Sequence, residues 1–555
     1  MSLYSGPDAA DPGTHWSNTL PLTGIRFLEV GEDFACAYAG HLLSLLGADV
    51  LRVPAPASGR AQGLVPGRVR GPGREQGPGQ GRKPAESQSC GLDAGKALFT
   101  GGTTEETLCR LPVAAAVDPT GSLASAPYPV VRTSPCPTPA RAWATSGAMA
   151  LTGRADGPPL LAPGDLATCL DGAALALRLL AAARGRPLSL NGSALLGERA
   201  AIFGHRRNGT VSNGGACRLF ATSDGWLAVS LSRDSDIELL PAWLGVPVPA
   251  DPRAAVATGA AAGSAHALAD RAQLLGIPAA VVGAPDHDDE QLRARGQQWP
   301  PAPWLYEGAP SRRPPPRPLD DLGRLGPSRT ASEQRPLVVD LSALWAGPLA
   351  GSFLVATGCR VVKVEDLRRP DPSRQGPPQF FDLLQGGKES VTVPVAATGA
   401  FPALIRAADV VIESSRPRAL EQLGIHPSPH QTWISITGYG RAGPWRNRAA
   451  LGDDAAAGAG LVARECEGGP PLFCADAAAD PITGLHAAVA ALAAVVGRTG
   501  GTVDIAMREV VGHALSHGRP TLPSDSGPVA APRSRTPART AAKLGADTDS
   551  VLADL

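Results

Sequence analysis

The chain has 555 residues, 43% of them hydrophobic, which is enough for two or more domains with cores of their own. Lys plus Arg and Asp plus Glu are equal at 51 each, so the overall charge attracts neither nucleic acid nor an anionic membrane. Residues 1–16 lack the apolar core of a signal peptide, no apolar run is long enough to span a membrane, and the nine cysteines lack CxxC or zinc-site spacing. We therefore expect a cytoplasmic protein without disulfides, a bound metal, a nucleic-acid partner or a membrane partner.

The first predicted elements are a strand, a helix and a second strand. Residues 25–30 and 49–53 are short apolar runs typical of buried strands, and the Ala- and Leu-rich helix between them ends at Gly47. The same order returns in the segments 337–341, 348–357 and 360–364. Short buried strands joined by helices predict an α/β fold with a Rossmann-like parallel sheet.

The composition changes to Gly, Pro, Arg and Gln between about residues 54 and 90, and such a segment buries too little apolar surface to become ordered. We expect residues 55–140 to be low in complexity and largely disordered. The arginines of residues 54–90 could indicate RNA binding, but aromatic residues for base stacking are missing there. A solvated linker is therefore the better interpretation.

The rest of the chain alternates between structured segments and linkers. Residues 145–200 are Ala- and Leu-rich and predict helices, whereas residues 217–231 predict a hairpin with its turn at 223–225. Pro-rich residues 299–318 and 518–537 predict linkers, and a short last helix follows. The predicted divisions are a βαβ segment at 20–54, low complexity at 55–140, a degenerate later part of the first unit at 141–298, a linker at 299–334, the second unit at 335–516, and a linker with the last helix (549–555) at 517–555.

Two stretches of the chain repeat each other imperfectly. Aligning residues 157–160 with 469–472, at an offset of 312, also aligns Gly172 with Gly484 and places Thr168 where Asp480 stands. A second match, at an offset of 311, relates the two βαβ segments through Gly40, Gly47 and Val53, which align with Gly351, Gly358 and Val364. The sequence therefore predicts two related units, of which the second alone has kept a carboxylate.

Asp480 is the candidate catalytic residue. It precedes Pro481 and the apolar run 485–496, which is the pattern of a helix start with an N-cap aspartate. The N-cap interpretation is compatible with catalysis, because a helix N-terminus favours the ionised carboxylate that a nucleophile needs. We expect His486, six residues further on, to be packed or solvated rather than catalytic.

Several positive or flexible positions follow predicted strands of the second unit. Ser415, Arg416 and Arg418 come after the apolar residues 409–412, and guanidinium groups there suit phosphates such as those of coenzyme A. Residues 438–440 form a Gly-Tyr-Gly segment after another strand, which is either a ligand loop or an ordinary turn. Neither a P-loop nor a dinucleotide fingerprint occurs, so P-loop nucleotides and nicotinamide cofactors are not expected.

Six ordered segments resemble the class III CoA-transferase family (CaiB/BaiF type), which includes formyl-CoA transferase, carnitine CoA-transferase and alpha-methylacyl-CoA racemase. They are residues 339–348, 361–365, 386–391, 408–424, 435–444 and 479–486. The first unit adds features similar to the family's opening and later part. The resemblance implies a Rossmann-like large domain, a smaller α+β domain, and interlocking of two chains or of the two units within this chain.

The resemblance also implies a mechanism. In such transferases the aspartate matching Asp480 attacks an acyl-CoA thioester, and an aspartyl-CoA thioester then passes coenzyme A to a carboxylic acid. Coenzyme A is the substrate and no cofactor is tightly bound. The residues expected to contact coenzyme A are Trp345, Ala346, Lys363, Lys388, Ser415, Arg416, Arg418, Thr437 and Tyr439.

Two alternatives remain open at this stage. A catalytically silent CoA-binding or scaffold homologue is suggested by the degenerate first unit and by a missing glycine-rich loop. An acyl-CoA racemase or epimerase is disfavoured, because Asp453 stands where the racemase branch has a histidine. Thr437 and Trp345 also depart from the residues that the family has at these positions. The acyl donor and acceptor are not specified by the sequence.

Overall fold

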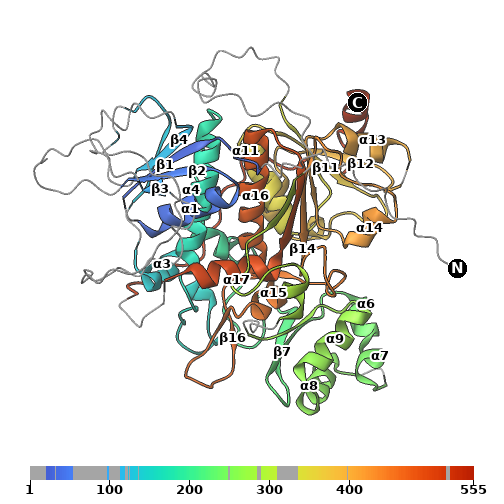
Figure 1. Ribbon diagram of the computed structural model, residues 1–555. Helices are drawn as coiled ribbons and strands as arrows, with labels where there is room; N and C mark the ends of the chain where they lie inside the picture. The colour runs from blue at the N-terminus through green and yellow to red at the C-terminus, as the bar shows by residue number, and fades with distance from the viewer. Residues whose placement is uncertain are drawn as a thin grey trace, which may run out of the picture.

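The computed structural model describes residues 20–31, 33–53, 97–98, 113–118, 123, 126–134, 137–247, 250–283, 289–308, 335–396, 398–519 and 526–555. Two parallel sheets lie on either side of the long helices α4 (Leu166–Ala183) and α16 (Ala479–Gly497), which contact each other at the centre of the molecule (Figure 1). We call residues 20–298 the first unit and residues 335–516 the second unit.

The sheet of the first unit contains the predicted βαβ segment. Its strand order is β3-β2-β1-β4-β5, and every pairing is parallel. The elements are β1 (Arg26–Val30), α1 (Phe34–Leu45), β2 (Asp49–Val53), β3 (Ala97–Leu98), β4 (Ala115–Asp118) and β5 (Val130–Arg132). Strands β3, β4 and β5 fall in the range that we predicted to be largely disordered, while residues 54–96 lie outside the described residues. These strands were missed because they are only two to four residues long and lie in a stretch whose composition predicts disorder.

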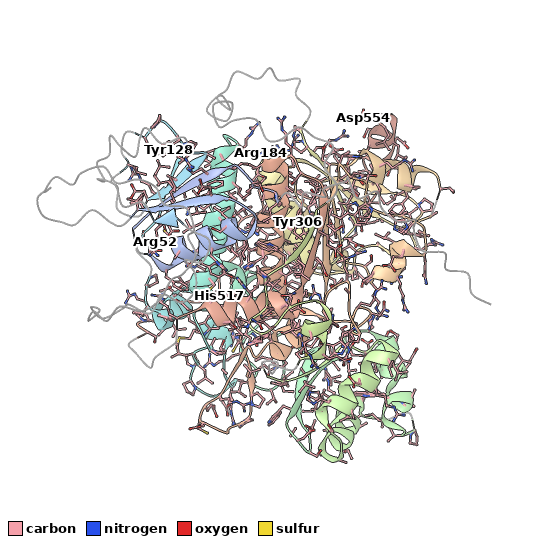
Figure 2. All side chains as sticks on the ribbon, viewed as in Figure 1. Arg52, Tyr128, Arg184, Tyr306, His517 and Asp554 are labelled. Carbon is pink, nitrogen blue, oxygen red and sulfur yellow. The ribbon has the colours of Figure 1, made fainter. Side chains whose placement is uncertain are left out.

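The sheet of the second unit is larger, with strand order β12-β11-β10-β13-β14-β17-β9. All pairings are parallel except that of β17 with β9. Strand β9 belongs to the stretch that we predicted to be a linker, and there Tyr306, labelled near the middle of Figure 2, donates its hydroxyl to Gly500 O at 2.8 Å. The strands are β9 (Leu305–Gly308), β10 (Leu337–Asp340), β11 (Arg360–Glu365), β12 (Glu389–Thr392), β13 (Val410–Glu413), β14 (Thr432–Thr437) and β17 (Gly501–Ala506).

Helices of both units make one shared core. Helix α1 packs on α4, α11 (Ala346–Ala356) packs on α16, and the two pairs meet through α4 and α16. Both long helices are apolar enough to span a membrane by length and composition, but 83% of each apolar window is buried inside the protein, as core helices require. The remaining helices of the second unit are α12 (Pro378–Gln385), α13 (Ala400–Ala407), α14 (Pro417–Glu421), α15 (Gly452–Gly458) and α17 (Met507–His517).

A smaller α+β module, residues 217–281, lies below the second unit in Figure 1. The predicted hairpin is confirmed as β6 (Cys217–Ala221) and β7 (Trp226–Ser230), and β8 (Ala279–Val281) joins β7 in an antiparallel sheet. Helices α6 (Asp234–Glu238), α7 (Leu240–Leu244), α8 (Pro252–Ala262) and α9 (Ala265–Leu275) cover this sheet, and α10 (Glu290–Ala294) leads back to the second unit. The other short elements are α3 (Pro139–Ser146), α5 (Glu198–Phe203), β15 (Val462–Ala463) and β16 (Leu472–Phe473).

Residues 526–555, which we call the C-terminal segment, bind both units instead of forming a loose linker. Ala530 N–H donates to Ala144 O in α3 at 2.9 Å, and Arg535 forms an ion pair with Glu198 at 2.6 Å. Further on, the carboxylate of Asp547 accepts the N–H of Ser390 in β12 at 2.8 Å, just before α18 (Thr548–Ala553). The sequence predicted a linker at residues 518–537 and a short last helix, but it did not predict these contacts with both units.

Candidate active site

Asp480 lies inside the first turn of α16 and not at its cap. The N-cap residue is Ala478, and no side chain caps the helix, so the predicted N-cap role of Asp480 is wrong. The carboxylate instead accepts a hydrogen bond from the backbone N–H of Ala346, the first residue of α11. The first-turn amides of a helix have no intrahelical partner and carry partial positive charge, so they suit an anionic group.

Two glycines permit this arrangement. A Cβ atom on Gly484 would lie 2.6 Å from the carbonyl oxygen of Ala346, so the missing side chain lets α16 approach α11 closely. A Cβ atom on Gly452 would lie 2.2 Å from Oδ2 of Asp480. Gly452 begins α15, and its backbone therefore forms one wall around the carboxylate.

An arginine of the first unit faces the same carboxylate. Arg199 in α5 holds Asp476 through two bonds, from Nε to Oδ2 at 2.8 Å and from Nη2 to Oδ1 at 2.6 Å. Its charge also acts on Asp480 and Asp453. His205 adds a contact from Nδ1 to Oδ1 of Asp476 at 3.3 Å. The acidic groups of the second unit thus receive their cationic partners from the first unit.

The carboxylates in this cluster differ in pKa. Burial raises the pKa of Asp480 to about 7, with Arg199 lowering it and Asp453 raising it further. Burial also raises the pKa of Asp453 to about 6. Burial works in the same direction on Asp476, but Arg199 and then His205 hold its pKa at about 2. Carboxylates with separated pKa values are typical of sites in which they have different chemical roles.

A pocket of about 590 Å³ opens beside this cluster. His205, Arg206 and Arg207 line one part of it, together with Leu151 and Pro532. His205 therefore contacts both the pocket and Asp476. Apolar walls with a few cationic groups suit an acyl chain or a carboxylate.

Residues 336–535 match the family model described as CoA-transferase family III. Over these residues the chain is similar to CoA-transferase family III. Relatives include an "Acyl-CoA transferase" of Fusarium pseudograminearum, 32% identical over 201 residues that cover 31% of this chain and 44% of the relative. The "Succinyl-CoA--D-citramalate CoA-transferase" of Chloroflexus aurantiacus is 30% identical over 218 residues, covering 36% of this chain and 51% of the relative. The matched part of this chain thus spans about half the length of these relatives.

A solved structure of a CAIB/BAIF family protein from Brucella suis is also similar to the chain. The sequence identity is 27%, with 32% of this chain and 54% of that chain covered, at a TM-score of 0.30.

Two of the predicted contact residues of the CoA-transferase segment adjoin Asp480. Ala346 supplies the amide described above, and Trp345 precedes it with 3% of its surface exposed. The guanidinium carbon of Arg199 lies 5.1 Å from the centroid of the Trp345 ring. The indole Nε1 is buried and has no hydrogen-bond partner among the described residues. Trp345 therefore packs against Arg199 next to the amide that binds Asp480.

The two predicted lysines of the CoA-transferase segment are buried and paired inside the fold. Lys363 forms an ion pair with Asp371 at 3.1 Å, and Lys388 forms one with Asp340 at 2.8 Å. Burial lowers the pKa of Lys388, although Asp340 opposes this effect. Both ammonium groups are thus engaged with carboxylates and are not presented at the surface.

Ser415, Arg416 and Arg418 lie after β13 as the sequence predicts. Ser415 donates its hydroxyl to Glu413 at 2.8 Å, whereas neither arginine forms an ion pair with a described carboxylate. Burial, followed by the charges of Arg418 and Arg233, lowers the pKa of Arg416. Arg233 belongs to the small module, so three guanidinium groups from two parts of the chain gather at this edge.

Thr437 ends β14, and Tyr439 lies in the loop after it, which the first unit covers. The Thr437 hydroxyl accepts the N–H of Gly440 at 2.8 Å, and Tyr439 is buried against Trp445 with ring centroids 5.5 Å apart. Gln291 of the first unit donates to the Tyr439 carbonyl at 2.7 Å. Arg295 fills the space above Gly440, where a Cβ atom would lie 2.2 Å from its guanidinium carbon. Tyr439 is consequently a packing residue in this structure.

Arg199, Asp476 and Gly452 were missed by the sequence reasoning. Arg199 is 277 positions from Asp476, so no local spacing could connect them. Asp476 is marked out by the structure and not by the sequence: Ala475 and Ala477 on either side of it have positive φ values of 56° and 45°. Such backbone is unfavourable for residues with a Cβ atom and is often found at functional sites.

Proposed function

We propose that this protein transfers coenzyme A between an acyl-CoA thioester and a carboxylic acid through a covalent intermediate on Asp480. The observation that carries the proposal is the surroundings of this carboxylate: a buried position, the Ala346 amide, the Gly452 backbone and the Arg199 charge. Relatives whose printed names are acyl-CoA transferase and succinyl-CoA--D-citramalate CoA-transferase support the reaction class.

In the proposed reaction, an Asp480 oxygen attacks the thioester carbonyl carbon. The carbon–sulfur bond breaks, and the coenzyme A thiolate leaves a mixed anhydride on the enzyme. The thiolate then attacks the aspartyl carbonyl, which releases the first carboxylic acid as its carboxylate and leaves an aspartyl-CoA thioester. An acceptor carboxylate attacks this thioester, and a second thiolate attack on the new anhydride forms the product and restores Asp480.

The surrounding groups have distinct tasks in this proposal. The Ala346 amide, at the N-terminus of α11, stabilises the negative charge that develops on oxygen when Asp480 reacts. Arg199 supplies positive charge next to the same atoms, while its bonds to Asp476 keep its guanidinium group in place. Burial keeps water away from the reactive esters and makes the carboxylate a better nucleophile.

We also infer that the two units are a repeat that functions as a dimer within one chain. Arg199 and His205 come from the first unit, and Asp480 and Asp476 from the second, so the cluster needs both. The first unit also covers the loop of Tyr439 through Gln291. The guanidinium groups of Arg233, Arg416 and Arg418 are the proposed site for coenzyme A phosphates.

Covalent trapping tests the proposal. The full chain is incubated with a panel of acyl-CoA thioesters, quenched with hydroxylamine and digested for peptide mass spectrometry. We expect a hydroxamate on Asp480 with at least one donor and none in the Asp480→Asn protein. The neighbouring Asp453 and Asp476, read in the same digest, are internal controls for unspecific reaction. Coenzyme A binding without modification by any donor would instead indicate a silent homologue.

A racemase or epimerase is the second candidate, because Asp453 lies beside Asp480 and both carboxylates have pKa values raised by burial. Two such groups can exchange a proton with a substrate carbon. Incubation of 2-methylacyl-CoA in D₂O separates the two functions. Deuterium at the α carbon without a hydroxamate would favour racemisation, and a hydroxamate without deuterium would favour transfer.

A further inference from the structure

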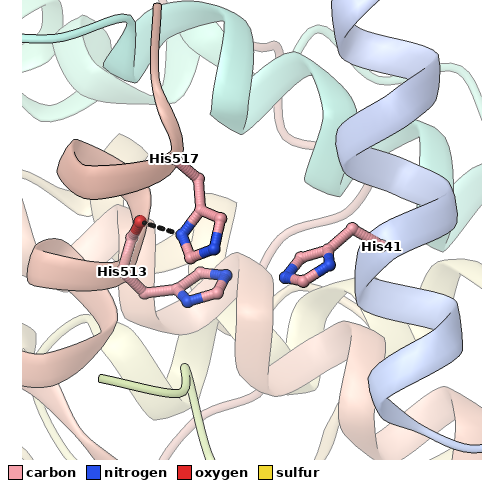
Figure 3. Close-up of side chains that lie close together, drawn as sticks. All are labelled: His41, His513 and His517. Carbon is pink, nitrogen blue, oxygen red and sulfur yellow. Dashed lines mark hydrogen bonds between the residues drawn. The ribbon is translucent and has the colours of Figure 1, made fainter. Parts of the chain in front are cut away.

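Three histidines from distant parts of the sequence meet between the two units. His41 belongs to α1, while His513 and His517 lie one turn apart on α17. One ring nitrogen from each residue lies within 4.8 Å of the others. Figure 3 shows the three rings facing one another across a small gap. The cluster is separate from Asp480 and has no part in the reaction proposed above.

The hydrogen bonds of two of these rings define which nitrogen carries the proton. Nδ1 of His513 lies 3.0 Å from Pro301 O, and Nδ1 of His517 lies 3.0 Å from His513 O. A carbonyl oxygen only accepts, so both Nδ1 atoms must donate. In a neutral ring that donates through Nδ1, the other nitrogen, Nε2, keeps a lone pair.

The lone pair of His513 lacks a partner in the described part of the chain. Its Nε2 is fully buried without a hydrogen bond there, and only 2% of the residue is exposed. A buried nitrogen acceptor without a partner is unfavourable and uncommon in native proteins. The ring of His41 stacks on that of His513 with centroids 5.4 Å apart and planes inclined by 10°. A histidine with Nδ1 bound to a carbonyl and Nε2 free is the usual arrangement of a metal ligand.

We propose that His41, His513 and His517 bind a divalent transition-metal ion of the zinc type. Three imidazole donors select Zn²⁺, Co²⁺, Ni²⁺ or Cu²⁺ over Mg²⁺ and Ca²⁺, which require oxygen ligands. Zinc–nitrogen bonds of about 2.0–2.1 Å would draw the nitrogens together by roughly 1 Å or more. His517 is partly exposed, which leaves an entry path and a fourth position for water.

The ion would tie the two units together. Helix α1 carries His41 in the first unit, and α17, which begins in the second unit and ends at His517, carries the other two ligands. In the sequence, the four-residue spacing of His513 and His517 is the single sign of such a site, since His41 is remote from them. Because a metal that binds the folded state alone stabilises it, unfolding of the protein should depend on the ion.

The test uses the full chain stripped of metal by a chelator and then titrated with Zn²⁺ or Co²⁺ alone. We expect one ion per chain by calorimetry, a cobalt absorption spectrum of a four-coordinate site, and a melting temperature raised by zinc. His517→Gln and His41→Gln should weaken binding at least tenfold and remove the thermal shift. The control His426→Gln, at an exposed position, should leave all three measurements unchanged.

Circular dichroism and gel filtration establish that each variant is folded before titration. His517→Gln is the decisive variant, because its partly exposed position near the end of α17 tolerates substitution. The proposal is overturned if the folded wild-type chain binds neither zinc nor cobalt stoichiometrically. It is equally overturned if His517→Gln and His41→Gln bind zinc as tightly as His426→Gln does.

Discussion

The surroundings of Thr168 in α4 and of Asp480 in α16 share several contacts. A Cβ atom added to Gly172 would lie 2.7 Å from the carbonyl oxygen of Ala35. In the same way, a Cβ atom on Gly484 would lie 2.6 Å from the carbonyl oxygen of Ala346. An arginine lies over an aromatic ring in both places, Arg519 at 4.9 Å from Phe34 and Arg199 at 5.1 Å from Trp345. Each arginine also forms an ion pair of 2.6 Å with a buried aspartate, Asp165 in the first case and Asp476 in the second.

The two places differ in the origin of the carboxylate that meets the first helical amides. In the first unit Asp33 caps its own helix, accepting from Ala35 N at 3.0 Å and Cys36 N at 3.2 Å. The position equivalent to Asp33 is Leu344, with a φ of 69° and no capping oxygen. Asp480 therefore supplies the acceptor from the facing helix. The start of α1 is thus capped by its own aspartate and is structural. The start of α11 has no such cap and binds the carboxylate of Asp480, which makes it part of the candidate catalytic site.

The largest effect should come from replacing Asp480, while replacing its counterpart Thr168 should have almost none. Asp480→Asn removes the nucleophile, so transferase activity should fall on the order of 10⁴-fold. Thr168→Val, its counterpart, should leave activity within twofold, because Arg519 still neutralises Asp165. Initial rates with the donor identified by trapping measure both variants. Equal loss in the two proteins would contradict the assignment of chemistry to the second unit.

Removal of the two arginines should separate catalysis from stability. Arg199→Ala should lower activity about 10²- to 10³-fold, as loss of a charge-stabilising donor does. It also leaves Asp476 buried without its partner, which costs about 3–5 kcal/mol of unfolding free energy. Arg519→Ala should destabilise the protein by a similar mechanism at Asp165 while leaving kcat unchanged. Urea unfolding and initial rates are the measurements, and a loss of kcat in Arg519→Ala would argue against the comparison.

A smaller steric change should displace the nucleophile without removing it. Gly452→Ala places a methyl carbon 2.2 Å from Oδ2 of Asp480, so the carboxylate must shift. A misplacement of about 1 Å can lower the rate roughly 10²-fold. Gly225→Ala is the matched control, because nothing lies within 4 Å of its Cβ position. Rates of hydroxamate formation at Asp480 distinguish this loss from unfolding. Full activity in Gly452→Ala would mean that the carboxylate moves away from α15 before it reacts.

The pH dependence should give the smallest effect. Asp480 must be ionised to attack, so activity should rise as pH increases through about 7. A carboxyl pKa raised above its unfolded value means that the folded state holds the proton more tightly, so this group lowers stability as pH rises from about 4 to 7. Asp453→Asn removes a neighbouring negative charge and should shift the activity profile to lower pH. An unchanged profile in that variant would show that the two carboxylates are not coupled.

The sequence predicted the elements of this fold better than the site. The βαβ segments and the hairpin were visible because strand and helix periodicities are local, and their ends carry glycines such as Gly47 and Gly358. Asp480 was visible through the repeat. Arg199 was not, because it reaches Asp476 across 277 positions. The N-cap prediction failed for a related reason: a neighbouring helix, which local pattern does not include, offered the better amide.

The C-terminal segment has a consequence for the order in which the protein matures during synthesis. Glu198, next to Arg199 in α5, is fixed by Arg535, and the edge strand β12 is held by Asp547 and α18. These anchors are synthesised after α5, because Arg535 follows Glu198 by 337 positions. Nascent chains should therefore carry the nucleophile before the arginine helix is secured, and competence should begin only after Arg535 and Asp547 have been synthesised.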